Sequence, residues 1–303
     1  MTSVREQSGY FQAGDQDQRL YGTLYVPDGA VPHAGVLFLP PFGEEWKCSY
    51  RHLVRTARGL AQNGYGAFRF DLSGTGESTG SHANASFSLW QQESVAAFDV
   101  MVREIPATQT WALLGARLGA NLAVRLAAER QAASVILMEP LLTGQDYLRD
   151  LLRRQLIKGV MGGGASAVPE SPAEDVWKAG HAADLGGFQV GPELAEELTQ
   201  LRLVEDMQKL RPECRVQLLR FSGGKEFPPG WQPVLERARG VDKSDVRIVH
   251  EKPFWGQLEY YETDSLLDNV LRFLDMDHDS DTAATCGLTG TAASTANAHR
   301  NGS

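Results

Sequence analysis

The sequence predicts an α/β fold, in which a mainly parallel sheet carries helices on both faces. Short apolar runs of strand length, such as Gly35–Leu39 (GVLFL) and Ser134–Met138 (SVILM), alternate with longer segments whose apolar residues recur at helical spacing. A glycine turn at residues 64–66 (GYG) leads from one such segment into the next apolar run. Alternation of this kind builds right-handed βαβ crossovers, which lay helices against a parallel sheet.

The predicted elements follow one another in a regular order. Strands are expected at residues 20–26, 35–39, 67–72, 110–114, 134–138, 216–221 and 246–250, and helices at 51–62, 87–104, 118–130, 232–239 and 260–274. No helix separates the first two strands, so the sequence predicts an antiparallel edge there.

Residues 143–211 interrupt this alternation with helix-like segments at 146–157 and 193–203. We expect them to form a helical lid over the carboxyl ends of the strands, where open α/β sheets bind ligands. Residues 1–142 and 212–276 would then form the core. Residues 277–303, rich in Ser, Thr, Ala, Asn and Asp, would form a disordered tail.

The first lid helix allows two interpretations. Its leucines share one face and its basic residues lie around them. The leucines either pack on the body of the protein or form a basic amphipathic surface that touches acyl chains or a membrane.

Charge and composition exclude several classes of protein. The chain has 303 residues, with 29 Lys and Arg against 38 Asp and Glu, a net charge of −9, so we expect no nucleic-acid partner. Its apolar runs are far shorter than the roughly 20 residues that span a bilayer, and its N-terminus lacks the apolar core of a secretory signal. Three widely spaced cysteines give no metal-ligand pattern. We therefore expect a cytoplasmic protein with no transmembrane segment, metal or cofactor; its oligomeric state stays open.

Residues 115–119 (GARLG) have the context of a nucleophile elbow, because they follow a predicted strand and open a predicted helix. Small residues at the ends of such a motif let strand and helix approach around a sharp turn, and the central residue projects from its tip. That residue is Arg117. A guanidinium stays protonated and cannot act as a nucleophile.

Two further motifs surround this elbow. Residues 39–45 (LPPFGEE) stand where an oxyanion loop is expected, with the backbone N–H of Phe42 or Gly43 as one donor and that of Leu118 as the other. Residues 71–80 (DLSGTGESTG) follow the next strand. Their glycine spacing fits neither a dinucleotide-binding nor a phosphate-binding loop.

Together these motifs resemble the α/β-hydrolase superfamily, near its serine-aminopeptidase-like and lysophospholipase-like branch. Residues 41–45 (PFGEE), the elbow with Arg117 and residues 139–148 (EPLLTGQDYL) resemble a bacterial subgroup of hydrolases named for association with exosortase and exopolysaccharide gene clusters. The resemblance runs from about residue 35 to residue 203. It implies an α/β-hydrolase fold and an ester or other acyl substrate, while Arg117 replaces the expected serine.

The other triad positions are also unusual. In the superfamily the acid follows the strand expected at 216–221, where Glu226 is the nearest carboxylate. The histidine belongs in the loop after the last strand, but residues 251–256 (EKPFWG) contain none, and the nearest is His250 at the strand end. We therefore take Glu226 and His250, with Arg117, as the candidate catalytic residues.

A cation at the elbow tip needs an anion, because the adjacent helix N-terminus already carries positive partial charge. The anion could be Glu44, Glu45 or Glu226, which would fill an inactive site, or a carboxylate, phosphate or sulfate of a ligand held by the guanidinium and the backbone N–H groups. Two functions follow. One is a hydrolase of an ester or acyl substrate with a non-standard active site, and the other is a pseudoenzyme that binds an anionic ligand at Arg117.

Overall fold

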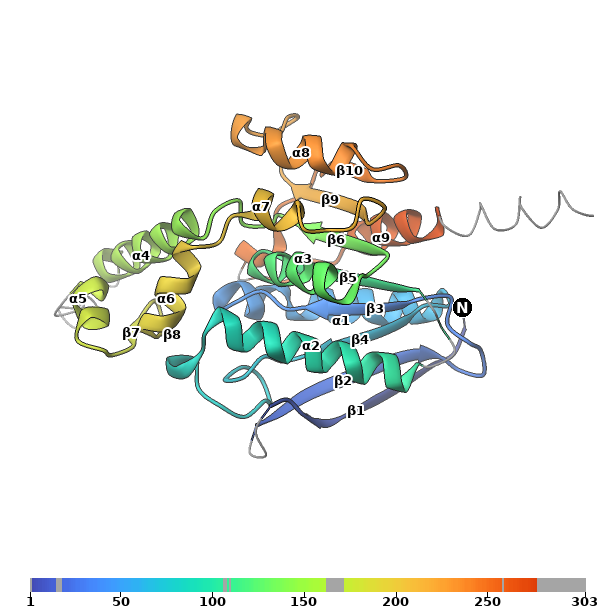
Figure 1. Cartoon of the computed structure of the whole chain (residues 1–303), viewed down its shortest axis with the longest axis horizontal. Coiled ribbons are helices and arrows are strands. Elements are labelled where there is room, and N and C mark those ends of the chain that lie inside the picture. Colours follow the sequence, from blue (N-terminus) through green and yellow to red (C-terminus); the bar gives the residue numbers. More distant parts are fainter. Residues whose placement is uncertain are drawn as a thin grey trace, which may run out of the picture.

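A computed structural model describes residues 2–14, 18–105, 108, 110–161, 172–257 and 259–276. Within them an eight-stranded sheet lies between two layers of helices (Figure 1). Its strands are β1 (Val4–Gln12), β2 (Arg19–Pro27), β3 (Gly35–Leu39), β4 (Gly66–Phe70), β5 (Trp111–Ala116), β6 (Ser134–Met138), β9 (Arg215–Phe221) and β10 (Asp245–Val249). The strand order β1-β2-β4-β3-β5-β6-β9-β10 is parallel from β4 to β10 and antiparallel at β1, β2 and β4. The predicted α/β architecture with a mainly parallel sheet is confirmed.

Helices cover both faces of this sheet. They are α1 (Glu44–Gln62), α2 (Phe87–Glu104), α3 (Leu118–Arg130), α8 (Gln232–Arg239) and α9 (Ser265–Asp275), with short 3₁₀ turns η1 (His82–Asn84), η2 (Pro229–Trp231) and η3 (Phe254–Gly256). One apolar core lies between the sheet and α2, α3 and α8, and a second lies between the sheet and α1 and α9. The strands of the centre, such as β3 and β6, are buried along their whole length, as expected for a sheet covered on both sides.

The antiparallel edge differs from the prediction. β1, which the sequence pattern did not indicate, pairs with β2 over nine residues, and β2 pairs with β4 rather than with β3. β1 is exposed along most of its length, so it lacks the apolar run by which the other strands were recognised. The first two predicted strands are therefore not neighbours.

A further group of elements connects β6 to β9, and Figure 1 shows most of it at the left end of the molecule. It contains α4 (Gly144–Met161), α5 (Ala173–Lys178), the hairpin of β7 (Ala183–Asp184) and β8 (Gln189–Val190), α6 (Pro192–Thr199) and α7 (Leu203–Met207). We call it the α4–α7 segment. The leucines of α4 divide along its length, because Leu148 is buried in the core whereas Leu156 is 59% exposed. The expected tail, 277–303, lies outside the described residues.

The described helices include none that is both long enough and apolar enough to pass through a lipid bilayer.

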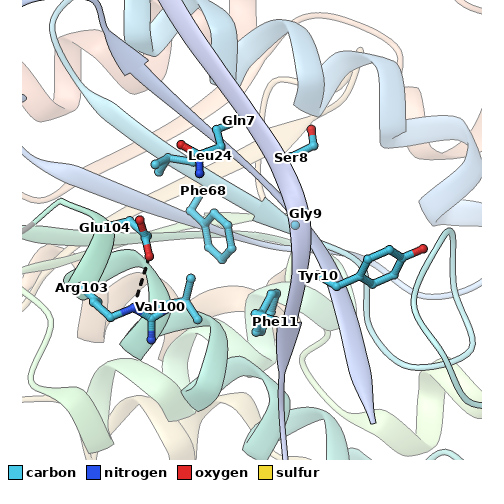
Figure 2. Close-up of a pocket in the computed structure, with 11 residues that line it drawn as sticks. Gln7, Ser8, Gly9, Tyr10, Phe11, Leu24, Phe68, Val100, Arg103 and Glu104 are labelled. Atoms are coloured by element: carbon cyan, nitrogen blue, oxygen red, sulfur yellow. Dashed lines mark hydrogen bonds and ion pairs between the residues drawn. The ribbon is translucent and has the colours of Figure 1, made fainter. Parts of the chain in front are cut away.

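Two glycines form a small pocket beneath the β1–β2 ribbon. Gly9 and Gly22 stand opposite each other in the register, and a cavity of about 120 Å³ beside them is lined by Phe11, Phe68 and Val100 among others. In Figure 2 these three side chains surround the space next to Gly9, while Tyr10 points away from it. A Cβ atom on Gly9 would meet nothing within 4 Å, whereas one on Gly22 would lie 2.6 Å from the Phe68 ring.

We expect alanine at these two positions to have opposite effects. Gly9→Ala should stabilise the fold by about 0.5 kcal/mol, because it restricts the unfolded chain and fits without strain. Gly22→Ala should destabilise it by about 1–3 kcal/mol, because the packed Phe68 ring must move. Urea unfolding of both variants measures the difference, and a destabilised Gly9→Ala protein would contradict this description of the pocket.

His52 is a buried titratable group on α1. It is 4% exposed, and its ring stacks on Phe254 of η3 with 4.6 Å between ring centroids. Burial lowers the pKa of His52 to about 4; Glu251 acts in the opposite direction, and Arg55 and Arg51 lower it further. The folded protein therefore holds His52 neutral.

This shift makes stability depend on pH. The pKa of His52 is 6.5 in the unfolded chain and about 4 in the folded protein, so between these pH values the unfolded chain is protonated while the folded protein is not. The stability that neutral His52 contributes is therefore complete above pH 6.5 and is lost as the pH falls from 6.5 toward 4. Urea midpoints at pH 7 and pH 4.5 should fall less in His52→Phe than in the wild-type protein. An equal fall in both proteins would show that other groups cause the acid sensitivity.

Candidate functional site

The chain reverses sharply between β5 and α3, and Arg117 stands at the tip of this turn. Its φ of 54° and ψ of −121° are strained for a residue with a side chain. Two glycines permit the turn. A Cβ atom on Gly115 would lie 2.3 Å from the carbonyl oxygen of Gly119, and a Cβ atom on Gly119 would lie 2.3 Å from the carbonyl oxygen of Leu39. The elbow predicted from residues 115–119 thus forms, and it lies directly against the loop that follows β3.

That loop contains residues 40–43 of the segment in which the sequence predicts an oxyanion loop. Gly43, with φ 65°, ends it and α1 begins at Glu44. Phe42 is 3% exposed and packs against Trp90 and against Phe188 of the α4–α7 segment. The beginning of α1 therefore lies between the elbow and the α4–α7 segment.

Arg117 does not project freely from the elbow. Its Nε donates to Glu45 Oε1 at 3.0 Å, and its Nη1 donates to the Glu139 carbonyl oxygen at 3.0 Å. The side chain of Arg117 is 15% exposed and that of Glu45 is 3% exposed. Of the three carboxylates considered as partners, the structure thus pairs Arg117 with Glu45.

Glu45 also interacts with two side chains of α4. The Tyr147 hydroxyl donates to Glu45 Oε2 at 3.2 Å, and Arg154 Nη1 lies 3.7 Å from Glu45 Oε1. Burial opposes the charge of Arg117, but Glu45, Tyr147 and Glu139 outweigh it and raise the pKa of the guanidinium. Burial, together with Glu45, also raises the pKa of Tyr147, so the phenol stays a neutral donor.

A second carboxylate, Glu139, lies at the carboxyl end of β6. Its φ is 43°, its Oε2 accepts from the backbone N–H of Phe221 at 3.3 Å, and its Oε1 lies 3.9 Å from Arg220 Nε. Burial raises the pKa of Glu139, although Arg117 and Arg220 favour its charged form. We call these residues, together with Tyr147, the Arg117 cluster. It contains three cations, Arg117, Arg154 and Arg220, and two carboxylates, Glu45 and Glu139, so its cations exceed its carboxylates by one.

A narrow cleft opens beside the cluster. It is lined by Phe42, Gly43, Glu44, Glu45, Tyr147, Leu151, Arg154, Gln155, Leu185, Gly186 and Phe188, and its volume is about 20 Å³. This is room for about one water molecule. Lys47 is a further cation near the cleft, with its Nζ 4.8 Å from the centre of the Phe188 ring. The cleft thus combines an apolar wall with charged groups at its base.

The structure gathers some predicted site residues and separates others. Phe42, Gly43, Glu44 and Glu45 line the cleft, and Leu118 is buried at the start of α3. Glu226 and His250 instead line a groove beside α8 and β10 that shares no lining residue with the cleft. No contact joins either of them to Arg117 in the described chain, so a triad-like arrangement of the three is not formed.

Four residues of the cluster were missed by the sequence analysis: Glu139, Tyr147, Arg154 and Arg220. Tyr147 and Arg154 are seven positions apart, which places them on one face of a helix, and this signal was available. Glu139 directly follows a predicted strand, where functional side chains of parallel sheets gather.

No group of three or more histidine, cysteine or acidic residues in the described part of the chain is placed to hold a metal ion.

Comparisons with known proteins agree with this architecture. A family model described as serine aminopeptidase, S33, matches residues 31–226. Among solved structures, Est1E of Butyrivibrio proteoclasticus with bound ferulic acid is 14% identical with a TM-score of 0.59, covering 91% of this chain and 99% of that one. Proline iminopeptidase of Mycobacterium smegmatis is 18% identical with a TM-score of 0.59, covering 92% of this chain and all of that one. A search of curated proteins found no match.

The family match spans well over half of the chain, including residues 39–45, the elbow and the whole α4–α7 segment. The solved structures share the fold along nearly the whole of both chains. This chain belongs to the serine aminopeptidase S33 family of α/β hydrolases.

Proposed function

We propose that this protein binds an anionic ligand with an acyl-like apolar part at the Arg117 cluster, beneath the α4–α7 segment acting as a lid. The observation that carries the proposal is the residue at the elbow tip. In place of a nucleophile the turn presents a guanidinium, held by Glu45 and by the Glu139 carbonyl. Such a site is suited to holding an anion and lacks the group that forms an acyl-enzyme.

The charge of the cluster supports an anionic ligand. Glu45 is shared by Arg117 and Arg154, and Arg154 is 45% exposed where it lines the cleft. A ligand carboxylate or phosphate could therefore take over one guanidinium without leaving Glu45 unpaired. The surplus positive charge favours this exchange.

The walls of the cleft support an apolar ligand portion. Phe42 and three residues of the α4–α7 segment line it: Leu151 lies on α4, and Leu185 and Phe188 lie between β7 and β8. Since the cleft holds about one water molecule as it stands, entry requires the α4–α7 segment to move away from α1. The resemblance to exosortase-associated hydrolases supports a ligand from exopolysaccharide or exosortase pathways. We place the protein in the cytoplasm as part of this proposal.

A thermal-shift series tests the proposal. Fatty acids, acyl phosphates and sugar phosphates are compared on wild-type protein, Arg117→Ala and Arg117→Lys. An anion at 100 times its Kd should stabilise the wild type by about 2.7 kcal/mol. Arg117→Ala should lose this stabilisation, and Arg117→Lys should keep part of it, because an ammonium lacks the planar fork.

Arg130→Ala is the matched control, since Arg130 lies at the other end of α3 and pairs with the exposed Asp99. It should respond to the anion as the wild type does. If no anion stabilises the wild type more than Arg117→Ala, the arginine is a structural partner of Glu45 and the ligand proposal fails.

Glu139 favours a second candidate, hydrolysis of an ester or acyl substrate without a covalent intermediate. Burial raises the pKa of this carboxyl, which suits it as a general base beside Arg117. Glu139 would accept a proton from water, the hydroxide would attack the acyl carbon, and the alcohol would leave with that proton as the C–O bond breaks. This candidate is supported if the wild-type protein hydrolyses esters slowly and without a burst, and if Glu139→Gln loses this hydrolysis.

A further inference from the structure

A groove follows the open edge of the sheet at β10. Within the described chain, β10 hydrogen-bonds to β9 and forms one end of the strand order. A cavity of about 660 Å³ lies along this edge, with Leu235 and Arg239 of α8 on one side and Asn269 of α9 on the other. Consecutive residues 246–249, whose side chains point to alternate faces, all line it. The groove therefore runs along the strand edge itself.

The backbone of β10 presents to this groove hydrogen-bonding groups that pair with no other described residue. The Ser222 N–H donates to the Val249 carbonyl oxygen at 3.0 Å, so the polar backbone groups of Val249 point toward β9. Backbone direction alternates along a strand, so those of Val246 and Ile248 point toward the open edge. An exposed row of this kind is a template for pairing with another extended chain.

The rim of the groove is positively charged although the whole chain has a net charge of −9. Lys225 and Arg239 are exposed and form no ion pair with another described residue. Arg247 is paired with Asp245 at 2.6 Å, and Glu226 is the one carboxylate among the lining residues. The local charge thus complements a negatively charged partner.

We propose that this groove binds an extended acidic peptide segment of a partner protein, which adds to β10 as a further strand. Its backbone would pair with Val246 and Ile248, and its carboxylates would lie against Lys225 and Arg239. The apolar residues Phe227 and Leu235, which also line the groove, would receive the side chains between them. The proposal is independent of the ligand proposed for Arg117, because the two sites share no lining residue.

Fluorescence anisotropy with a labelled peptide of alternating glutamate and valine tests this inference on the full chain. The double variant Lys225→Glu/Arg239→Glu should weaken binding at least about tenfold, or about 1.4 kcal/mol. Ile248→Pro should abolish it, because proline removes an outward N–H at a position where an edge strand tolerates it. Hydrogen exchange of residues 244–250 should slow when the peptide binds.

Arg5→Glu is the matched control, since Arg5 is an exposed residue on β1, the opposite edge of the sheet. It should bind the peptide like the wild type, and circular dichroism confirms that each variant is folded. Equal binding of a lysine–valine peptide, or unchanged binding in the double variant, would overturn the proposal. Absence of binding would show that the charges only keep the edge unpaired. A wild-type dimer that Ile248→Pro disrupts would assign the edge to a second copy instead.

Discussion

Glu45→Gln should destabilise the protein by about 3 kcal/mol, a large share of the stability of an ordinary domain. Glutamine keeps the size of the side chain but removes the charge that Arg117 and Arg154 share. The remaining amide oxygen can still accept from Arg117 Nε, but the guanidinium, 15% exposed at its side chain, would face only one negative charge, the more distant carboxylate of Glu139. The loss therefore comes from a buried cation without a direct counter-charge.

Arg117→Met should cost less, about 1–2 kcal/mol, because Glu45 keeps Tyr147 and Arg154 as partners. The double variant should lose clearly less than the two single variants together, and this difference measures the coupling between the pair. Urea unfolding at pH 7 provides all three values.

The pair Arg130–Asp99 serves as the control cycle, since it also involves α3 but Asp99 is 58% exposed. Its coupling should stay below about 1 kcal/mol, as for other surface ion pairs. If Glu45→Gln is as mild as Asp99→Asn, the Arg117 cluster is solvated more than its burial indicates, and the structural description of the site is wrong.

The sequence was informative where local chemistry decides the structure. The elbow and the loop before α1 could be predicted, because only small residues at Gly115 and Gly119 allow helix and strand to approach so closely. The buried strands could be predicted from their apolar runs. β1 could not, because its exposed residues VREQSGYFQ carry no such run and its place depends on pairing with β2.

The partner of Arg117 shows a second limit. Glu44, Glu45 and Glu226 were all near enough in the predicted topology to be candidates. Adjacent helix residues point about 100° apart, so the rotation of α1 decides that Glu45 rather than Glu44 reaches the elbow. That rotation depends on packing of α1 against the sheet and η3, which no local pattern encodes.

Restoring a serine at the elbow should not restore esterase activity. Arg117→Ser places a hydroxyl at the tip, but the loop at residues 251–256 after β10 contains no histidine to activate it. Phe254 and Trp255 of that loop are buried against Phe221, and His250 lines the β10 groove instead. A positioned base contributes about 10²–10⁴-fold, so the variant should hydrolyse p-nitrophenyl esters no more than about tenfold faster than the wild type.

Stopped-flow release of nitrophenol and labelling by a fluorophosphonate probe are the measurements, on the wild type and on Arg117→Ser. Both proteins should show no burst and no labelling, because neither has an activated nucleophile. Slow burst-free hydrolysis in the wild type, lost in Glu139→Gln, would point to water activated by Glu139. A burst stoichiometric with wild-type protein would reveal a displaced nucleophile, to be sought with Ser73→Ala, Ser78→Ala and Ser222→Ala. A gain of about 10³-fold or more in Arg117→Ser would mean that a base already faces the elbow, contrary to the separation of His250 from Arg117.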